Sequence, residues 1–135
     1  MERGFISRKS KGINAERELI HLFWANNWAA IRVAGSGSSR YPSSDLLVGN
    51  GERRMAIECK TISNSIKYFQ KEEIGQLITF ARMFGAEPWL AIKFMGSSWY
   101  FLNPEDISIS GNNFSVSLET ARKKGLLLEE LINKS

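Results

Sequence analysis

The apolar residues recur with two different periods along the chain, which predicts helices alternating with strands. Leu19, Ile20 and Phe23 follow a helical spacing behind the capping residue Asn14, and a second run with the same spacing ends at Gly85. Shorter apolar runs between glycine-containing turns predict strands. The predicted helices cover residues 14–27 and 70–85, and the predicted strands cover residues 28–34, 45–49, 52–60, 88–94 and 98–102.

The order of these elements predicts an α/β fold with a central mixed five-stranded sheet flanked by helices. After Pro104 the pattern is weaker, with a strand expected within residues 114–121 and a short amphipathic helix over residues 126–134. The sequence has neither an internal repeat nor a long linker, so we expect one domain over residues 1–135. Residues 1–11 are expected to form a basic arm at its start.

The composition is that of a soluble globular protein, with 43% hydrophobic and 24% charged residues. The single cysteine, Cys59, permits no internal disulfide, which suits a reduced compartment. No apolar run approaches the roughly 20 residues of a membrane helix, and the polar, basic start of the chain has no apolar signal core. We therefore expect a cytoplasmic, intracellular protein that does not enter a membrane.

The chain is moderately basic, with a formal charge of +4 and an isoelectric point near 9.4. Such a charge is compatible with nucleic-acid binding without requiring it. The distribution is more informative, because basic residues crowd the start of the chain. They form either a solvated tail or an arm that neutralises phosphates. These residues are Arg3, Arg8, Lys9, Lys11 and Arg17.

The hairpin around Asn50–Gly51 contains the first candidate catalytic residues. Asn-Gly is the strongest short hairpin signal, and a two-residue turn there places Asp45 opposite Ala56. Side chains alternate between the two faces of a strand, so Asp45 shares one face with Glu58 and Lys60. The other face of the second strand is apolar and is expected to pack into the core through Met55, Ile57 and Cys59.

Two carboxylates at the end of a half-buried strand need compensation, because they repel each other and lose hydration. A divalent cation beside the lysine provides it, and hard oxygen ligands favour Mg²⁺ or Mn²⁺ over zinc. The alternative interpretation is a surface strand end with a Glu–Lys pair, since the pattern Glu-x-Lys alone is very common. The shared face of Asp45, Glu58 and Lys60 favours the metal site.

Glu16 is an unusual residue in the first predicted helix, because it lies on the apolar stripe of that helix. Taken alone, it is better interpreted as an exposed carboxylate of the first turn, which the helix dipole favours. Beside Asp45 and Glu58, the better interpretation is a third carboxylate of the metal site.

Several segments together resemble the archaeal Holliday junction resolvases, which belong to the restriction-endonuclease-like superfamily. The resemblance runs from about Lys11 to Phe101 and includes the segments KGINAEREL, FWANNWAAIRVAGSGS, DLLVGNG, AIECK, LITFARMFG and WLAIKF. Each motif is modest, whereas their order and spacing together are specific. The superfamily motif P-D…(D/E)-x-K is incomplete here, because Ser44 precedes Asp45 and the nearest proline is Pro42.

The resemblance implies a restriction-endonuclease-like fold and a Mg²⁺-dependent site, with Mn²⁺ as a substitute and no small organic cofactor. Glu16, Asp45 and Glu58 would bind the metal. Lys60 would orient the attacking water and stabilise charge in the transition state. Metal ions and lysines supply this electrostatic stabilisation in phosphodiester hydrolysis.

The resemblance also places Ser36 near the cleaved phosphate, and Arg17 and Arg32 at the rim of the site. For Ser36, ordinary loop composition is also an open interpretation, since Ser38 and Ser39 are adjacent. Arg32 is equally compatible with a charge on the solvent face of a strand.

The implied function is a structure-selective endodeoxyribonuclease that resolves four-way DNA junctions by paired symmetric nicks during recombination and repair. One alternative is another Mg²⁺-dependent nuclease of the same fold that cuts duplex or flap DNA, and a second is a DNA-binding scaffold without catalysis. The retained Asp45, Glu58 and Lys60 argue against the scaffold, because pure binding favours neutral or basic residues. The expected DNA contacts are Arg3, Arg8, Lys9, Lys11, Arg17, Arg32, Arg40 and Lys67.

The second predicted helix has more apolar surface than packing on one sheet requires. Its second apolar stripe predicts a homodimer, since two-fold dimers are the commonest assemblies and a four-way junction has the same symmetry. The alternative is that the C-terminal tail covers this stripe. The predicted interface residues are Leu77, Phe80, Met83 and Phe84.

Overall fold

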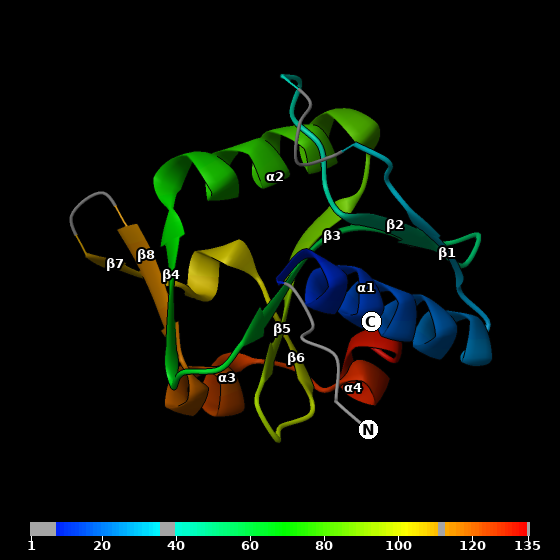
Figure 1. The fold of residues 1–135 in the computed structure, drawn as a ribbon. Helices are drawn as coiled ribbons and strands as arrows, with labels where there is room; N and C mark the ends of the chain where they lie inside the picture. Colours follow the sequence, from blue (N-terminus) through cyan, green and yellow to red (C-terminus); the bar gives the residue numbers. More distant parts are fainter. Residues whose placement is uncertain (1–7, 36–39, 111–112, 135) are drawn as a thin grey trace.

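A mixed five-stranded sheet forms the centre of the structure, as predicted (Figure 1). The computed structural model describes residues 8–35, 40–110 and 113–134. The strand order is β1-β2-β3-β5-β6, in which β3 and β5 are parallel and the other neighbours are antiparallel. The strands are β1 (Ala29–Arg32), β2 (Leu46–Gly49), β3 (Arg54–Ile62), β5 (Glu87–Phe94) and β6 (Trp99–Leu102).

Helices cover both faces of this sheet (Figure 1). The first face packs against α1 (Arg8–Ala25) and α4 (Leu128–Ile132), and Leu19 of α1 is fully buried there. The second face packs against α2 (Lys71–Phe84). None of the helices in the described ranges is long and apolar enough to cross a membrane.

The first helix is longer at its start than predicted. It begins at Arg8, six residues before the predicted start, so residues 8–11 of the expected arm are helical. Lysine and arginine have high helix propensity, which explains why the helix continues through this basic segment. It ends at Ala25, and Asn27 adopts a left-handed conformation (φ 65°) that turns the chain toward β1.

The β2–β3 hairpin has a different register from the predicted one. Gly49 pairs with Arg54, so the loop contains four residues rather than two. The side chain of Asn50 accepts hydrogen bonds from the N–H groups of Glu52 (2.9 Å) and Arg53 (2.7 Å), which stabilise the wider loop. The register moves by two residues, and this preserves the alternation of faces. The side chains that pack toward α1 are therefore the predicted Met55, Ile57 and Cys59.

A second sheet of three strands was not expected, because the sequence pattern assigns no helix or strand to residues 61–68. The chain leaves β3 at Ile62 and returns as β4 (Ile66–Gln70). This strand pairs with β8 (Asn113–Ser117), which in turn pairs with β7 (Ser108–Ser110). Because the partner strands lie far away in the sequence, the local pattern of residues 61–68 could not reveal the pairing.

The C-terminal segment differs in part from its prediction. The strand expected within residues 114–121 ends at Ser117, whose hydroxyl oxygen accepts a hydrogen bond from the N–H of Thr120 (3.0 Å). This cap starts α3 (Leu118–Lys124), which replaces the second half of the expected strand. The helix expected over residues 126–134 is present as the shorter α4. A 3-10 turn, Pro104–Asp106, precedes β7.

The prediction for α2 is correct to within one residue at each end. Gln70 is its N-cap, and the N–H of Gln70 donates to Oε2 of Glu73 at 3.0 Å, as in a capping box. Gly85 follows the last turn with a φ of 83°, a conformation that glycine adopts without strain. The side chain of Glu73, in the first turn of α2, also reaches β3, where its Oε1 lies 3.4 Å from Nζ of Lys60.

Candidate active site

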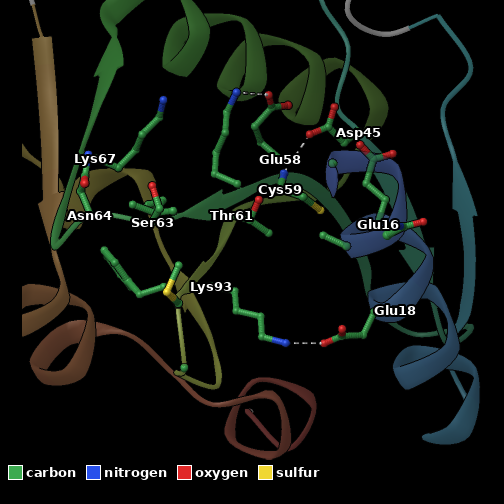
Figure 2. Close-up of a pocket in the computed structure, with 18 of the residues that line it drawn as sticks. Glu16, Glu18, Asp45, Glu58, Cys59, Thr61, Ser63, Asn64, Lys67 and Lys93 are labelled. Atoms are coloured by element: carbon green, nitrogen blue, oxygen red, sulfur yellow. Dashed lines mark hydrogen bonds and ion pairs between the residues drawn. The ribbon is translucent and has the colours of Figure 1, made fainter. Parts of the chain in front are cut away.

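A groove of about 990 Å³ lies over the second half of β3 (Figure 2). Its walls come from the start of α1, the residue before β2, the start of α2, β4 and the β5–β6 turn. The predicted Glu16, Asp45, Glu58 and Lys60 all line it, so the structure brings these four residues together. Other lining residues that the prediction did not place in the metal site are Glu18, Asn64, Lys67, Glu73 and Lys93.

Backbone hydrogen bonds fix Asp45 at the start of β2. Its N–H donates to the carbonyl oxygen of Ile57 (3.0 Å), and its Oδ2 accepts from the N–H of Cys59 (2.9 Å). Because Ile57 and Cys59 flank Glu58, the side chains of Asp45 and Glu58 lie at the same level of the hairpin (Figure 2). The predicted common location of the two carboxylates is confirmed, although the register is two residues away from the predicted one.

Burial and neighbouring negative charge raise the pKa values of two carboxylates in the groove. Burial and then the charge of Asp45 raise the pKa of Glu58 to about 8, although Lys60 opposes this shift. Burial and Asp45 also raise the pKa of Glu16, against the guanidinium of Arg32, whose Nε donates to Oε1 of Glu16 at 2.8 Å. At neutral pH and without a cation, Glu58 therefore holds a proton for most of the time.

Lys60 lies between two carboxylates on the α2 side of the groove. Its Nζ is 3.8 Å from Oε2 of Glu58 and 3.4 Å from Oε1 of Glu73. Burial lowers the pKa of Lys60, but the charges of Glu58, Glu73 and Asp45 outweigh burial and raise it. Lys60 is therefore a permanent cation at neutral pH.

Glu73 is a site residue that the sequence analysis missed. The order Gln-Lys-Glu-Glu at the start of α2 is a capping-box pattern and could have drawn attention to Glu73 as a cap. Its approach to Lys60 depends on how α2 packs across β3, which the sequence pattern does not report.

The carboxylate oxygens at the acidic end of the groove, where Glu16, Asp45 and Glu58 lie, are ligands that suit a hard divalent cation. Burial followed by the charge of Asp45 raises the pKa of Glu58, which a bound cation would lower. In the side-chain conformations of the described residues, no three of the His, Cys, Asp and Glu side chains are close enough to hold an ion. Side-chain rotation of Glu16 away from Arg32 would be needed to complete a three-carboxylate site.

Of the predicted DNA contacts whose side chains the structure describes, one lines the groove and three are exposed. Arg17, Arg32 and Arg40 are exposed, and Arg40 lies over the ring of Tyr41 with 5.5 Å from Cζ to the ring centroid. Lys67 lines the groove beside β4. The predicted Arg8, Lys9 and Lys11 belong to the first turns of α1, with their side chains outside the described part, and Arg3 and Ser36 lie outside the described residues altogether.

The residues of the predicted dimer stripe differ in how far they are exposed. Leu77 is only 1% exposed and belongs to the core between α2 and the sheet, so its assignment to an interface was wrong. Phe80 is half-buried and stacks on Phe84 with 5.5 Å between ring centroids. Met83 and Phe84 are 83% and 51% exposed, so the described part of the C-terminal tail does not cover them.

Comparisons with known proteins find similar chains among archaeal nucleases. A family model described as archaeal Holliday junction resolvase (hjc) matches residues 7–135. Crossover junction endodeoxyribonuclease Hjc of Archaeoglobus fulgidus is 40% identical over 126 residues, which cover 93% of this chain and 92% of that protein. Crossover junction endodeoxyribonuclease Hje of Saccharolobus solfataricus is 34% identical over 130 residues, which cover 91% of this chain and 93% of that protein.

A solved structure shows that the similarity extends to the fold. The 1.6 Å structure of Archaeoglobus fulgidus Hjc, described as a Holliday junction resolvase from an archaeal hyperthermophile, superposes with a TM-score of 0.85 at 37% identity. The match covers 90% of this chain and 98% of that one. The expected restriction-endonuclease-like α/β fold is therefore confirmed.

Proposed function

Because this chain belongs to the archaeal Holliday junction resolvase family, it is a junction-resolving endodeoxyribonuclease, and we propose that the acidic end of the groove is its catalytic centre. The observation that most supports this assignment is the convergence of Asp45, Glu58 and Lys60 at one end of the β2–β3 hairpin. Hydrolysis of a phosphodiester requires a cation, an activated water and a stabilised dianionic transition state, and these residue types provide for all three.

In this proposal Glu16, Asp45 and Glu58 hold Mg²⁺, for which Mn²⁺ can substitute, and no organic cofactor takes part. When bound, such an ion supplies Lewis-acid polarisation of the phosphate and lowers the pKa of a bound water. Asp45 is already fixed by the N–H of Cys59, so it presents a preorganised ligand. Glu16 must exchange its hydrogen bond with Arg32 for the cation.

Lys60 acts in this proposal as a fixed positive charge beside the carboxylates. Its ammonium group orients the attacking water and stabilises negative charge that develops on the phosphate. Arg17 and Arg32 contact phosphates at the rim, and Ser36 lies near the cleaved phosphate, as the family resemblance implies. The raised pKa of Lys60 supports this role, because the charge persists over the physiological pH range.

We expect binding of Mg²⁺ or Mn²⁺ to release close to one proton per site at pH 7. A carboxyl group with a pKa of about 8 is about 90% protonated at that pH and must ionise to bind a cation. Because the protonated fraction falls as pH rises, the apparent metal affinity will increase through pH 8 and level off above it. Calorimetric titration in buffers of different ionisation enthalpy measures the protons released.

The exposed acid Glu52 provides the control for this titration. Glu52→Gln changes one carboxylate outside the groove and should leave metal affinity and proton release unchanged. Affinity that is independent of pH between 6 and 9, with no proton release, would contradict the assignment of Glu58.

Removal of the metal with EDTA is expected to stop cleavage, and added Mg²⁺ should restore it.

The proposed DNA surface follows from the charges around the groove. Lys67 of β4 and Lys93 of β5 line the groove together with Glu16, Asp45 and Glu58, so phosphates that approach the acidic centre would meet cationic side chains. Contacts of this kind recognise the path of the DNA backbone rather than the base sequence. They therefore suit an enzyme that selects its DNA substrate by the shape of the junction. The proposed contacts are Arg3, Arg8, Lys9, Lys11, Arg17, Arg32, Arg40 and Lys67.

We propose that the protein acts as a homodimer through the apolar surface at the end of α2. Phe84 lines a second, smaller groove together with Ile31 and Leu47 on the outer face of β1 and β2, and Ile31 is 59% exposed. Exposed apolar side chains gathered in this way are typical of an interaction surface. A two-fold dimer would bury the surface and present two catalytic grooves to one junction, which supports paired symmetric nicks.

The described helices all pack around the central sheet and the small second sheet, which supports a single nuclease domain over residues 1–135. A DNA substrate and a lone cysteine support an intracellular location.

A further inference from the structure

Glu73 uses its two carboxylate oxygens for two different partners. Oε2 accepts from the N–H of Gln70 at 3.0 Å and closes the capping box of α2. Oε1 lies 3.4 Å from Nζ of Lys60 and accepts a hydrogen bond from it. The same side chain therefore joins the start of a rigid helix to the cationic residue of the groove.

The capping bond makes Glu73 a better anchor than an ordinary surface carboxylate. A lysine side chain places its ammonium group at the end of a flexible four-carbon stem. A partner that can itself rotate would not define the position of the ammonium group. Here the carboxylate of Glu73 is held to the backbone of Gln70 at one oxygen, so the other oxygen has a defined position. The side chain of Glu73 is 38% exposed and that of Lys60 is 28% exposed, so the pair is only partly screened by solvent.

The other partner of Lys60 is Glu58, whose carboxylate would bind the metal during catalysis. Glu58 lies 3.8 Å from Nζ, and it is also a proposed metal ligand. A cation bound to Glu58 would engage this carboxylate and repel the ammonium group of Lys60. Glu73 then remains as the anionic partner that keeps Nζ beside the carboxylates.

We propose that Glu73 is a positioning residue that holds the ammonium group of Lys60 in the groove when Glu58 is engaged with the cation. The proposal rests on the catalytic role proposed above for Lys60. Glu73 does not itself contact DNA or the reacting atoms in this account. It acts through Lys60, so its loss should reduce the rate of the chemical step without weakening junction binding.

Glu73→Gln tests the proposal because glutamine also serves at this position of a capping box. The variant keeps an acceptor for the N–H of Gln70 and loses only the negative charge. We expect kcat for junction cleavage to fall by about 10- to 100-fold, the usual effect of removing a partner that orients a site residue. The KM for the junction, the Mn²⁺ affinity and the melting temperature should stay at their parent values.

Glu72→Gln is the matched control, because Glu72 is the preceding residue of α2, carries the same charge and is exposed outside the groove. It should cleave like the parent. Equal kcat values for the two variants would overturn the proposal and leave Glu73 as a helix cap only. A rise in KM with unchanged kcat would overturn it too, since Glu73 would then affect junction binding.

A Lys60→Met background separates failure of this proposal from failure of the catalytic assignment. If Lys60→Met cleaves like the parent, the role of Lys60 is wrong, and the proposal for Glu73 is overturned with it. If Lys60→Met is slow, adding Glu73→Gln should produce no further loss, because the two residues act as one unit. A full additional loss in the double variant would show that Glu73 acts independently of Lys60, which also overturns the proposal.

Discussion

The Asp45→Asn variant will bind a four-way junction within about threefold of the parent affinity but will cut it at least about 10³-fold more slowly. Asparagine has the same shape, and its side-chain oxygen can still accept the hydrogen bond from the N–H of Cys59. The fold and the surrounding cationic contacts are therefore preserved. What is lost is the charge of a proposed metal ligand, in the groove that Glu16 and Glu58 also line.

Two measurements on the same preparation check this expectation. Single-turnover cleavage in Mg²⁺ and in Mn²⁺ gives the rate, and mobility shift in Ca²⁺ gives the affinity without cutting. Glu52→Gln, in the exposed hairpin loop, is the control for a lost carboxylate and should match the parent in both assays. Cleavage by Asp45→Asn at the parent rate would show that the metal site lies elsewhere.

A charged residue in place of Phe84 will separate the proposed dimer into monomers. Phe84 is half exposed at the end of α2, and in a two-fold interface the substitution occurs twice. Loss of a central aromatic contact costs about 2 kcal/mol or more, which weakens dimerisation by at least about 30-fold. We expect Phe84→Glu to sediment as a 15.3 kDa monomer at concentrations where the parent has twice that mass.

The monomer should also lose paired cutting. It will bind the junction more weakly. The nicks that it makes will be single and uncoupled, because the two catalytic grooves are no longer held at a fixed distance from each other. Leu127→Glu is a matched control, since Leu127 is an exposed apolar residue at the start of α4, away from α2. A Phe84→Glu protein that stays dimeric would place the interface on another surface.

The common face of Asp45, Glu58 and Lys60 could be predicted from sequence for a robust reason. The side-chain period of a strand is two, so a register error of two residues leaves each side chain on its predicted face. The hairpin has a wider loop than the Asn-Gly signal indicated, yet the inference about the carboxylates was unaffected. An error of one residue would have reversed it.

Features that depend on contacts between distant segments were not predictable in the same way. The pairing of β4 with β8 and the approach of Glu73 to Lys60 both depend on how remote elements meet, and no local period reports that. Leu77 shows a related difficulty. It belongs to two overlapping apolar stripes on α2, and only the packed structure shows that the sheet already covers it.

Cleavage of an immobile four-way junction in Mg²⁺, beside a linear duplex of the same sequence, tests the resolvase assignment directly. We expect paired nicks at symmetric positions in the junction and an intact duplex. Equal cutting of both substrates would contradict structure selectivity and would indicate a general nuclease of the same fold. No cutting in either Mg²⁺ or Mn²⁺ would contradict the catalytic assignment of the acidic groove.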